Sequence, residues 1–252
     1  MFADTLKECM DEDISISAPA CEKVIAENKE PPDRMATAYY SRGFNHKENS
    51  ELDLAIADYS KAISLVPHYL KAYSLRAWAF DAQGQSERAI ADFLVVLSME
   101  PNKADALSGI GVQYHVLKQF DKALEFLDKA ILADPESAYA YNARANTYRL
   151  IGKHDEAVRD YTKAIKIEPS EIYLNNRGVM FAETGRDDLA VKDYNSAIAA
   201  NPGYAPAYYD LGLYWQKVHD KEKAMSLYKK ALEVEPGYQL AVDAMKKLEQ
   251  RK

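Results

Sequence analysis

Six prolines recur along this 252-residue chain at nearly constant spacing. Successive prolines are 34, 34, 34, 33 and 34 residues apart, and they are Pro67, Pro101, Pro135, Pro169, Pro202 and Pro236. A period of this size indicates a repeat architecture, in which each unit packs mainly on its neighbours. Counting back from each proline predicts six units within residues 36–236, at about 36–69, 70–103, 104–137, 138–170, 171–204 and 205–238.

The same residue types recur at the same places in each unit. The eighth and twentieth positions are small and the twenty-fourth is large, as in Gly43, Ala55 and Tyr59 of the first unit. Small side chains allow two helices to approach closely, and alternating large and small residues fill the space between them. Each proline ends a second helix, because it lacks the N–H group and clashes with the preceding turn. In three units a glycine marks the turn between the helices: Gly84, Gly152 and Gly185.

These residues resemble the tetratricopeptide repeat, whose pattern has small residues at positions 8, 20 and 27, an aromatic residue at 24 and proline at 32. The resemblance covers about four-fifths of the chain. It implies an all-α fold, a right-handed superhelical solenoid of six helix hairpins whose first helices line a concave inner surface. Runs such as AYYSRG and AIADYSKAI are similar to those of bacterial members of the family.

Both ends of the chain are predicted to cap the array. Residues 21–33, CEKVIAENKEPPD, match the end of a second helix, and residues 1–35 are predicted to form an N-terminal half-repeat that caps the array. Residues 239–252 carry an apolar stripe at Leu240, Ala244 and Leu248 with charged residues outside it, the pattern of a C-terminal capping helix.

The only two cysteines, Cys9 and Cys21, lie in the N-terminal segment. They could form a disulfide across a short hairpin, which would imply an oxidising compartment, or they could be two free thiols. The N-terminus lacks the basic and apolar regions of a secretory signal. Two locations therefore stay open: the cytoplasm, or the periplasm if a signal peptide has been removed.

Four units carry arginine at the seventh position, and the same four carry aspartate at position 23. The other two units carry apolar pairs at these places, Ile110 with Phe126 and Leu211 with Leu227. This covariation predicts a structural salt bridge between the two helices of each charged unit. The predicted pairs are Arg42 with Asp58, Arg76 with Asp92, Arg144 with Asp160, and Arg177 with Asp193.

The resemblance also implies a peptide-binding groove formed by positions 2, 5, 6, 9, 12 and 13 of the first helices. Aromatic residues would anchor a partner near Tyr40, Phe44 and Trp78, and a patch of asparagines would hydrogen-bond an extended backbone. The candidate groove residues are Tyr40, Phe44, Lys71, Trp78, Val112, Tyr139, Asn142, Asn146, Arg149, Asn175, Asn176, Val179, Tyr209 and Leu213.

Other functions find little support. A net charge of −7 without a clustered basic face speaks against nucleic acid as a partner, and no apolar run is long enough for membrane insertion. The five histidines fall at different repeat positions, so we expect no metal site. No trio of residues suggests a nucleophile, a base and an orienting group. We therefore expect no enzyme and no cofactor.

The sequence favours a scaffold or adaptor whose concave groove binds a peptide segment of another protein. The alternatives are a self-associating assembly protein, or the recruiting subunit of an enzyme or secretion complex. Binding of chaperone tails, for which the family uses a carboxylate clamp, is not expected, because Asn142, Pro206 and Asp210 occupy its basic positions.

Overall fold

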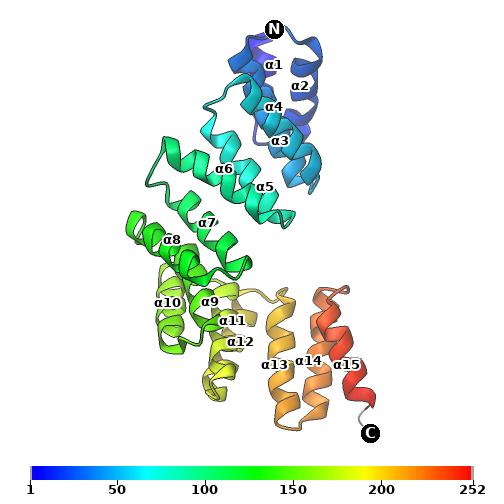
Figure 1. Cartoon of the computed structure of the whole chain (residues 1–252). Coiled ribbons are helices and arrows are strands. Elements are labelled where there is room, and N and C mark those ends of the chain that lie inside the picture. Colours follow the sequence, from blue (N-terminus) through cyan, green and yellow to red (C-terminus); the bar gives the residue numbers. More distant parts are fainter. Residues whose placement is uncertain (1, 251–252) are drawn as a thin grey trace. The chain divides into compact units, whose positions relative to one another are not determined.

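The computed structural model describes residues 2–250, with side chains from Thr5 onward, and this part of the chain contains fifteen α-helices and no strand (Figure 1). It divides into two compact units, Met1–Pro135 and Glu136–Lys252. The first unit holds α1 (Phe2–Cys9), α2 (Ile14–Glu27), α3 (Pro32–Glu48), α4 (Leu52–Leu65), α5 (Leu70–Ala82), α6 (Ser86–Met99), α7 (Ala104–Val116) and α8 (Phe120–Ala133). The second holds α9 (Ala138–Leu150), α10 (His154–Ile167), α11 (Glu171–Glu183), α12 (Asp187–Ala200), α13 (Ala205–Lys217), α14 (Lys221–Val234) and α15 (Gln239–Gln250). None of the described helices is long and apolar enough to cross a membrane.

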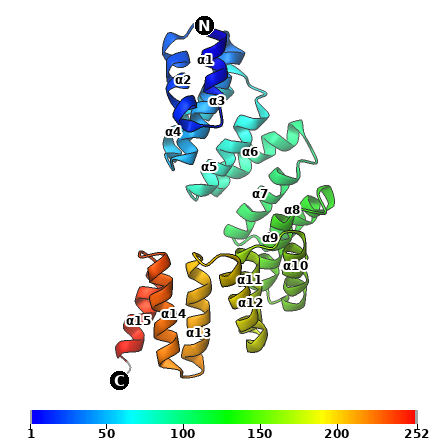
Figure 2. The ribbon, with the colours of Figure 1, turned by 180° about the vertical axis from the view of Figure 1, so that it is seen from behind.

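Within each unit the helices form antiparallel pairs joined by short turns, which Figure 2 shows from behind. In the first unit α3 pairs with α4, α5 with α6 and α7 with α8, and in addition α4 packs on α5 and α6 packs on α7. The second unit repeats this order from α9 to α14, and α15 packs on α14. Successive first helices also touch, because α3 contacts α5, α5 contacts α7, α9 contacts α11 and α11 contacts α13. The first helices of the pairs, α3, α5 and α7 in the first compact unit and α9, α11 and α13 in the second, therefore form one continuous layer in each.

Close contact inside a pair depends on the small residue at the eighth position. A β-carbon added at Gly212 would lie 2.6 Å from a ring atom of Tyr228, and one at Gly178 would lie 2.7 Å from Tyr194. These distances are too short for an alanine unless the ring moves. The aromatic ring at position 24 thus occupies the space that the glycine leaves open, and Tyr228 is fully buried there.

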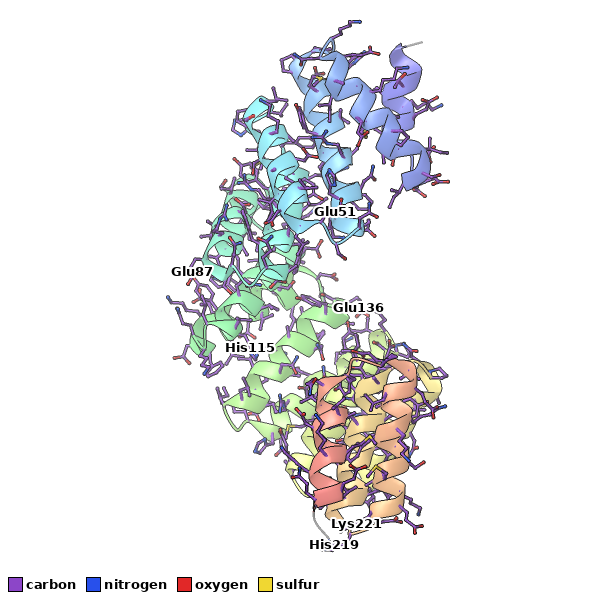
Figure 3. The ribbon with its side chains drawn as sticks, turned by 90° about the vertical axis from the view of Figure 1, so that its right-hand side faces the viewer. Glu51, Glu87, His115, Glu136, His219 and Lys221 are labelled. Atoms are coloured by element: carbon purple, nitrogen blue, oxygen red, sulfur yellow. A yellow bond between two sulfur atoms is a disulfide. The ribbon has the colours of Figure 1, made fainter. Side chains whose placement is uncertain are left out.

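The turn inside each pair contains one residue with a left-handed backbone. Three pairs use glycine, at Gly84, Gly152 and Gly185, with φ of 69°, 78° and 73°. The other three use Ser50, Lys118 and His219, with φ of 62°, 58° and 66°. Figure 3 labels His219 in this turn, next to Lys221 at the start of α14, and it also labels Glu51 and Glu87 at the starts of α4 and α6, where acidic residues favour a helix N-terminus.

The four arginines at the seventh position each hold an aspartate of the same pair through two hydrogen bonds. Arg144 donates from Nε and Nη2 to the two oxygens of Asp160 over 2.7 and 2.9 Å. The equivalent bonds of Arg42, Arg76 and Arg177 measure 2.7–2.8 Å. In the two pairs without arginine, Ile110 and Phe126 lie in one apolar cluster, and Leu211 and Leu227 lie in another.

The N-terminal segment packs as a helix pair, α1 and α2, on α3. A disulfide joins Cys9 of α1 to Cys21 of α2, and both cysteines are fully buried. They lie in an apolar cluster with Val24, Met35 and Ala38. This cluster covers the N-terminal end of the first unit with apolar contacts that α3 would otherwise leave exposed.

Candidate functional site

The first unit has a pocket on its layer of first helices, and we call it the aromatic pocket. Its volume is about 320 Å³, and it is lined by Tyr40, Leu70, Lys71, Ser74, Leu75, Trp78, Phe93, Lys103, Asp105 and Ala106. These residues come from α3, α5, α6, α7 and the residue before α7. Three of them, Tyr40, Lys71 and Trp78, are candidate groove residues from the sequence.

Aromatic side chains that line the aromatic pocket pack against other rings. Trp78 lies edge-on against Phe93 with ring centroids 5.1 Å apart, and Tyr40 lies 5.2 Å from Tyr69. Partial burial, together with the nearby Tyr69, raises the pKa of the Tyr40 hydroxyl, so that it stays neutral and can donate a hydrogen bond. The rings are therefore held by packing before any partner arrives, while the half-buried Trp78 keeps part of its surface accessible.

The lining of the aromatic pocket contains two lysines, Lys71 and Lys103, and one carboxylate, Asp105. Lys71 is exposed and forms no hydrogen bond or ion pair with any other described residue. Lys103 pairs with Glu100 at 3.2 Å, and both of these side chains are well exposed. A carboxylate or carbonyl group of a bound segment could therefore contact Lys71 without breaking an existing ion pair, whereas contact with Lys103 would compete with Glu100.

The second unit has a different pocket on its first-helix layer, which we call the acidic pocket. Its volume is about 300 Å³, and it is lined by Val179, Ala182, Glu183, Asp187, Tyr194, Asp210, Leu213, Tyr214 and Lys217. These residues come from α11, α12 and α13. Two of them, Val179 and Leu213, are candidate groove residues from the sequence.

The predicted asparagine patch differs from its expected form, because its amides bond to other side chains of the chain. Asn176 Nδ2 donates to Asn142 Oδ1 over 3.0 Å, and Tyr161 donates its hydroxyl to Asn146 Oδ1 over 2.6 Å. Asn175 Nδ2 donates to Asp210 Oδ2 over 2.8 Å. Asn142 and Asn175 are buried, with 8% and 4% of their surface exposed. Two of these bonds join successive first helices and stabilise the layer.

Of the remaining candidate groove residues, some have their side chains engaged by other residues of the chain, and others are exposed or half-buried. Tyr209 packs against the rings of Tyr228 and Tyr238, with centroids 5.9 and 5.7 Å away, and Arg149 pairs with Glu183 at 2.5 Å. Phe44 and Tyr139 are exposed, and Val112 is half-buried. These five residues line neither of the two pockets.

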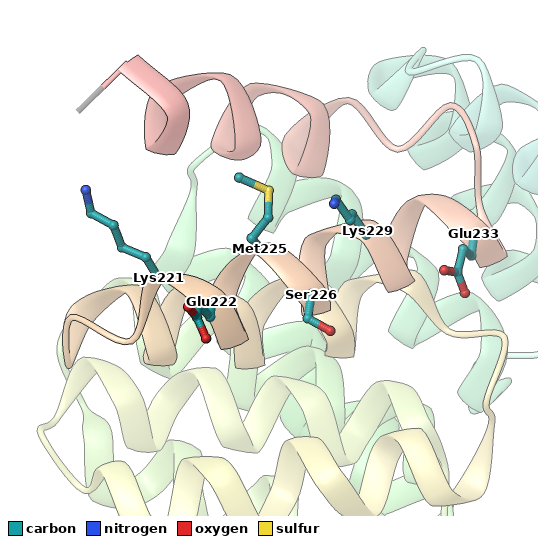
Figure 4. Close-up of a pocket in the computed structure, with 6 residues that line it drawn as sticks. All are labelled: Lys221, Glu222, Met225, Ser226, Lys229 and Glu233. Carbon is teal, nitrogen blue, oxygen red and sulfur yellow. The ribbon is translucent and has the colours of Figure 1, made fainter. Parts of the chain in front are cut away.

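A third hollow, of about 490 Å³, lies on α14 and is shown in Figure 4. Its lining comes from α14 alone and consists of Lys221, Glu222, Met225, Ser226, Lys229 and Glu233. It is open to solvent, and charges of both signs alternate along it. We do not assign it a ligand.

Several pocket residues were not among the candidates, notably Phe93, Tyr194 and Asp187. Phe93 and Tyr194 occupy position 24, which the repeat pattern assigns to the core. Tyr194 lies against Gly178, the small residue at position 8 of its own repeat, whereas Phe93 lies against Gly109 of the next first helix. A small residue at 8 with an aromatic residue at 24 was therefore an available signal for Tyr194, and the sequence held no equivalent signal for Phe93.

Comparisons with known proteins agree on one family. Models of the tetratricopeptide repeat match residues 40–106, 82–147, 138–171 and 205–238. No curated protein matches the chain.

Among solved structures, a tetratricopeptide repeat protein from Parabacteroides merdae is similar over 98% of both chains, with a TM-score of 0.83 and 19% identity. MamA is 26% identical over 64% of this chain and 94% of its own, with a TM-score of 0.54. YrrB, described as having an unusual peptide-binding site, is 23% identical over 75% of this chain and 97% of its own, with a TM-score of 0.52. These likenesses show that the fold is that of tetratricopeptide repeat solenoids.

Proposed function

The chain belongs to the tetratricopeptide repeat family of protein-interaction scaffolds, and we propose that it is an adaptor whose first helices bind a peptide segment of a partner protein. The fold is typically a non-enzymatic scaffold. The partner is a protein, and the finer proposal concerns where and how that protein is held.

The observation that carries the proposal is the aromatic pocket. Large apolar side chains in a concave site, fixed in place before binding, are typical anchors of protein interfaces. Here three successive first helices contribute to one pocket, whose lining includes the ring of Trp78 and the cation of Lys71. We propose that an apolar side chain of the partner enters this pocket and that a carboxylate or carbonyl oxygen beside it accepts a hydrogen bond from Lys71.

Peptides selected from a random display library on the full chain test the proposal. We expect the selected peptides to bind with a dissociation constant near the micromolar range. Trp78→Ala should weaken binding about 10-fold or more in calorimetry, since it removes a partly buried aromatic surface from the contact.

The matched control is Leu132→Ala, which removes apolar surface outside the pocket, from a side chain that is 82% exposed on α8. It should change the affinity by less than about twofold. Circular dichroism verifies that both variants keep their helices. Peptides that bind Trp78→Ala as tightly as the unchanged chain would contradict the proposal.

A further inference from the structure

The acidic pocket of the second unit contains one carboxylate that lacks a positive partner. Glu183 pairs with Arg149 at 2.5 Å, and Asp187 pairs with Lys217 at 2.8 Å. Asp210 receives only the amide of Asn175, at 2.8 Å, and it forms no ion pair with any described residue. The pocket therefore offers a single uncompensated negative charge.

The surroundings of Asp210 make that charge costly. Burial raises the pKa of Asp210 to about 6, even though the Asn175 amide and the charge of Arg149 act in the opposite direction. The carboxyl group is thus mainly ionised at neutral pH. Beside it, the buried Oδ1 atom of Asn175 accepts no hydrogen bond from any described residue. Buried acceptors normally have a donor, and Asp210 receives a single one, from Asn175 Nδ2.

The walls of the acidic pocket suit an alkyl chain that ends in a cation. Val179 from α11 and Leu213 from α13 present aliphatic surface, against which methylene groups can pack. Tyr194 and Tyr214 add aromatic rings to the lining. Apolar walls, aromatic rings and one open carboxylate are therefore present in the same pocket.

We propose that the acidic pocket binds a lysine side chain of the partner, with its ammonium group donating to Asp210 and its methylene groups lying between Val179 and Leu213. Lysine fits better than arginine, because Asn175 already engages Asp210 Oδ2 and leaves one carboxylate oxygen for the ligand. A guanidinium group gains most from a two-oxygen contact, whereas a compact ammonium needs one acceptor. This inference rests on the proposed function, since it names a second contact made by the same partner.

A small probe tests the pocket without the partner. N-acetyl-L-lysine methylamide is titrated into the full isotope-labelled chain, and amide shifts are followed by NMR. We expect saturable shifts in α11 and α13 with a dissociation constant of about a millimolar. N-acetyl-L-norleucine methylamide, which has the same chain without the charge, should produce no saturable shift there. Equal binding of the two probes overturns the proposal.

Two variants locate the charge. Asp210→Asn keeps the shape of the side chain and should weaken lysine binding about 10-fold or more. Glu233→Gln removes an equal charge from an exposed site on α14 and should leave binding within about twofold. If Asp210→Asn disturbs folding, Leu213→Ala keeps the carboxylate and should still weaken binding several-fold through loss of the apolar wall. Lysine binding that survives in both pocket variants overturns the proposal.

The pH dependence supplies an independent signature. The charged or titratable groups that interact electrostatically with Asp210 come from α9, α12, α13, α14 and the turns before α13 and α15: Arg149, Tyr194, Tyr209, Tyr228, Tyr204 and Tyr238. The tyrosine pKa values are raised, so these hydroxyls stay neutral between pH 5 and 8. Probe affinity should fall as the pH decreases through about 6, because protonation neutralises Asp210. Affinity that is constant from pH 7.5 to pH 5 contradicts an ion pair with this residue.

The outcomes for the two pockets can be told apart. Failure of the lysine probe, with peptide binding still dependent on Trp78, removes the inference and keeps the proposed function. Lysine binding, with peptide binding that does not depend on Trp78, keeps the inference and contradicts the proposed function of the aromatic pocket.

Discussion

The arginine at the seventh repeat position contacts more than the aspartate of its own helix pair. Arg76 Nη1 also donates to Ser60 Oγ over 2.9 Å, and Arg177 Nη1 donates to Thr162 Oγ1 over 3.1 Å. Ser60 and Thr162 belong to the second helix of the preceding pair. One guanidinium group therefore links three helices through hydrogen bonds. A hydrophobic residue at the same position can contact these helices only by packing.

A double-mutant cycle at Arg144 and Asp160 measures the strength of this contact. The side chain of Asp160 is buried, and that of Arg144 is mostly covered. Arg144→Leu should lower the free energy of unfolding by about 3 kcal/mol, because it leaves the buried carboxylate of Asp160 without its cation. The double variant with Asp160→Leu should recover most of that loss, as the natural pair Leu211 with Leu227 suggests. Chemical denaturation gives the four values.

The exposed pair Lys129 and Glu125 serves as the control for this cycle. Its coupling energy should be below about 0.5 kcal/mol, because solvent screens it. A double variant at positions 144 and 160 that is no more stable than Arg144→Leu alone would show that the two side chains are not energetically coupled.

The sequence predicted these ion pairs more easily than the amide contacts. Arginine at position 7 and aspartate at position 23 occur together in four of the six repeats and are both absent from the other two, so the repeats can be compared with one another. Asn142 and Asn176 bond to each other only once in the chain, between adjacent first helices. A contact that occurs once leaves no repeated pattern in the sequence. The position of a residue in the repeat indicates which face of the helix it lies on, but it does not indicate its hydrogen-bond partner. The linings of the two pockets were predicted only in part, because each pocket also occurs once.

At the level of elements, helix starts follow the predicted repeats closely. Five of the first helices begin at Leu70, Ala104, Ala138, Glu171 and Ala205, where the proline spacing begins each repeat. The exception is α3, which begins at Pro32, four residues before the expected Ala36. Proline at the start of a helix has a suitable φ and needs no N–H partner, so it allows an additional turn there.

The turn between α13 and α14 yields a prediction about stability. His219 adopts a φ of 66° on the surface, a conformation that costs a residue with a β-carbon about 1 kcal/mol or more. His219→Gly should therefore raise the free energy of unfolding by about 1 kcal/mol relative to His219→Ala, which removes the imidazole and keeps the β-carbon. Denaturant midpoints of the two variants provide the comparison. Equal midpoints would mean that the left-handed turn is not strained at this residue.

At the level of the whole molecule, each unit contains one of the two tryptophans. Trp78 packs with Phe80, Phe93 and other residues of the first unit, and Trp215 packs with the cluster around Tyr194 and Leu211 in the second. Repeat arrays gain stability from each repeat and from contacts with its nearest neighbours. A local change should therefore affect the nearer tryptophan more than the farther one.

Single-tryptophan versions of the chain test this locality. Trp215→Phe leaves Trp78 to report on the first unit, and Trp78→Phe leaves Trp215 to report on the second. Arg177→Leu, placed in both backgrounds, should shift the denaturant midpoint seen by Trp215 roughly twice as far as that seen by Trp78, because Arg177 holds Asp193 in the second unit. Arg76→Leu, which breaks the equivalent pair in the first unit, should reverse the order. If both tryptophans report equal shifts for both variants, the chain unfolds as one cooperative body, and stability is then shared across all helix pairs.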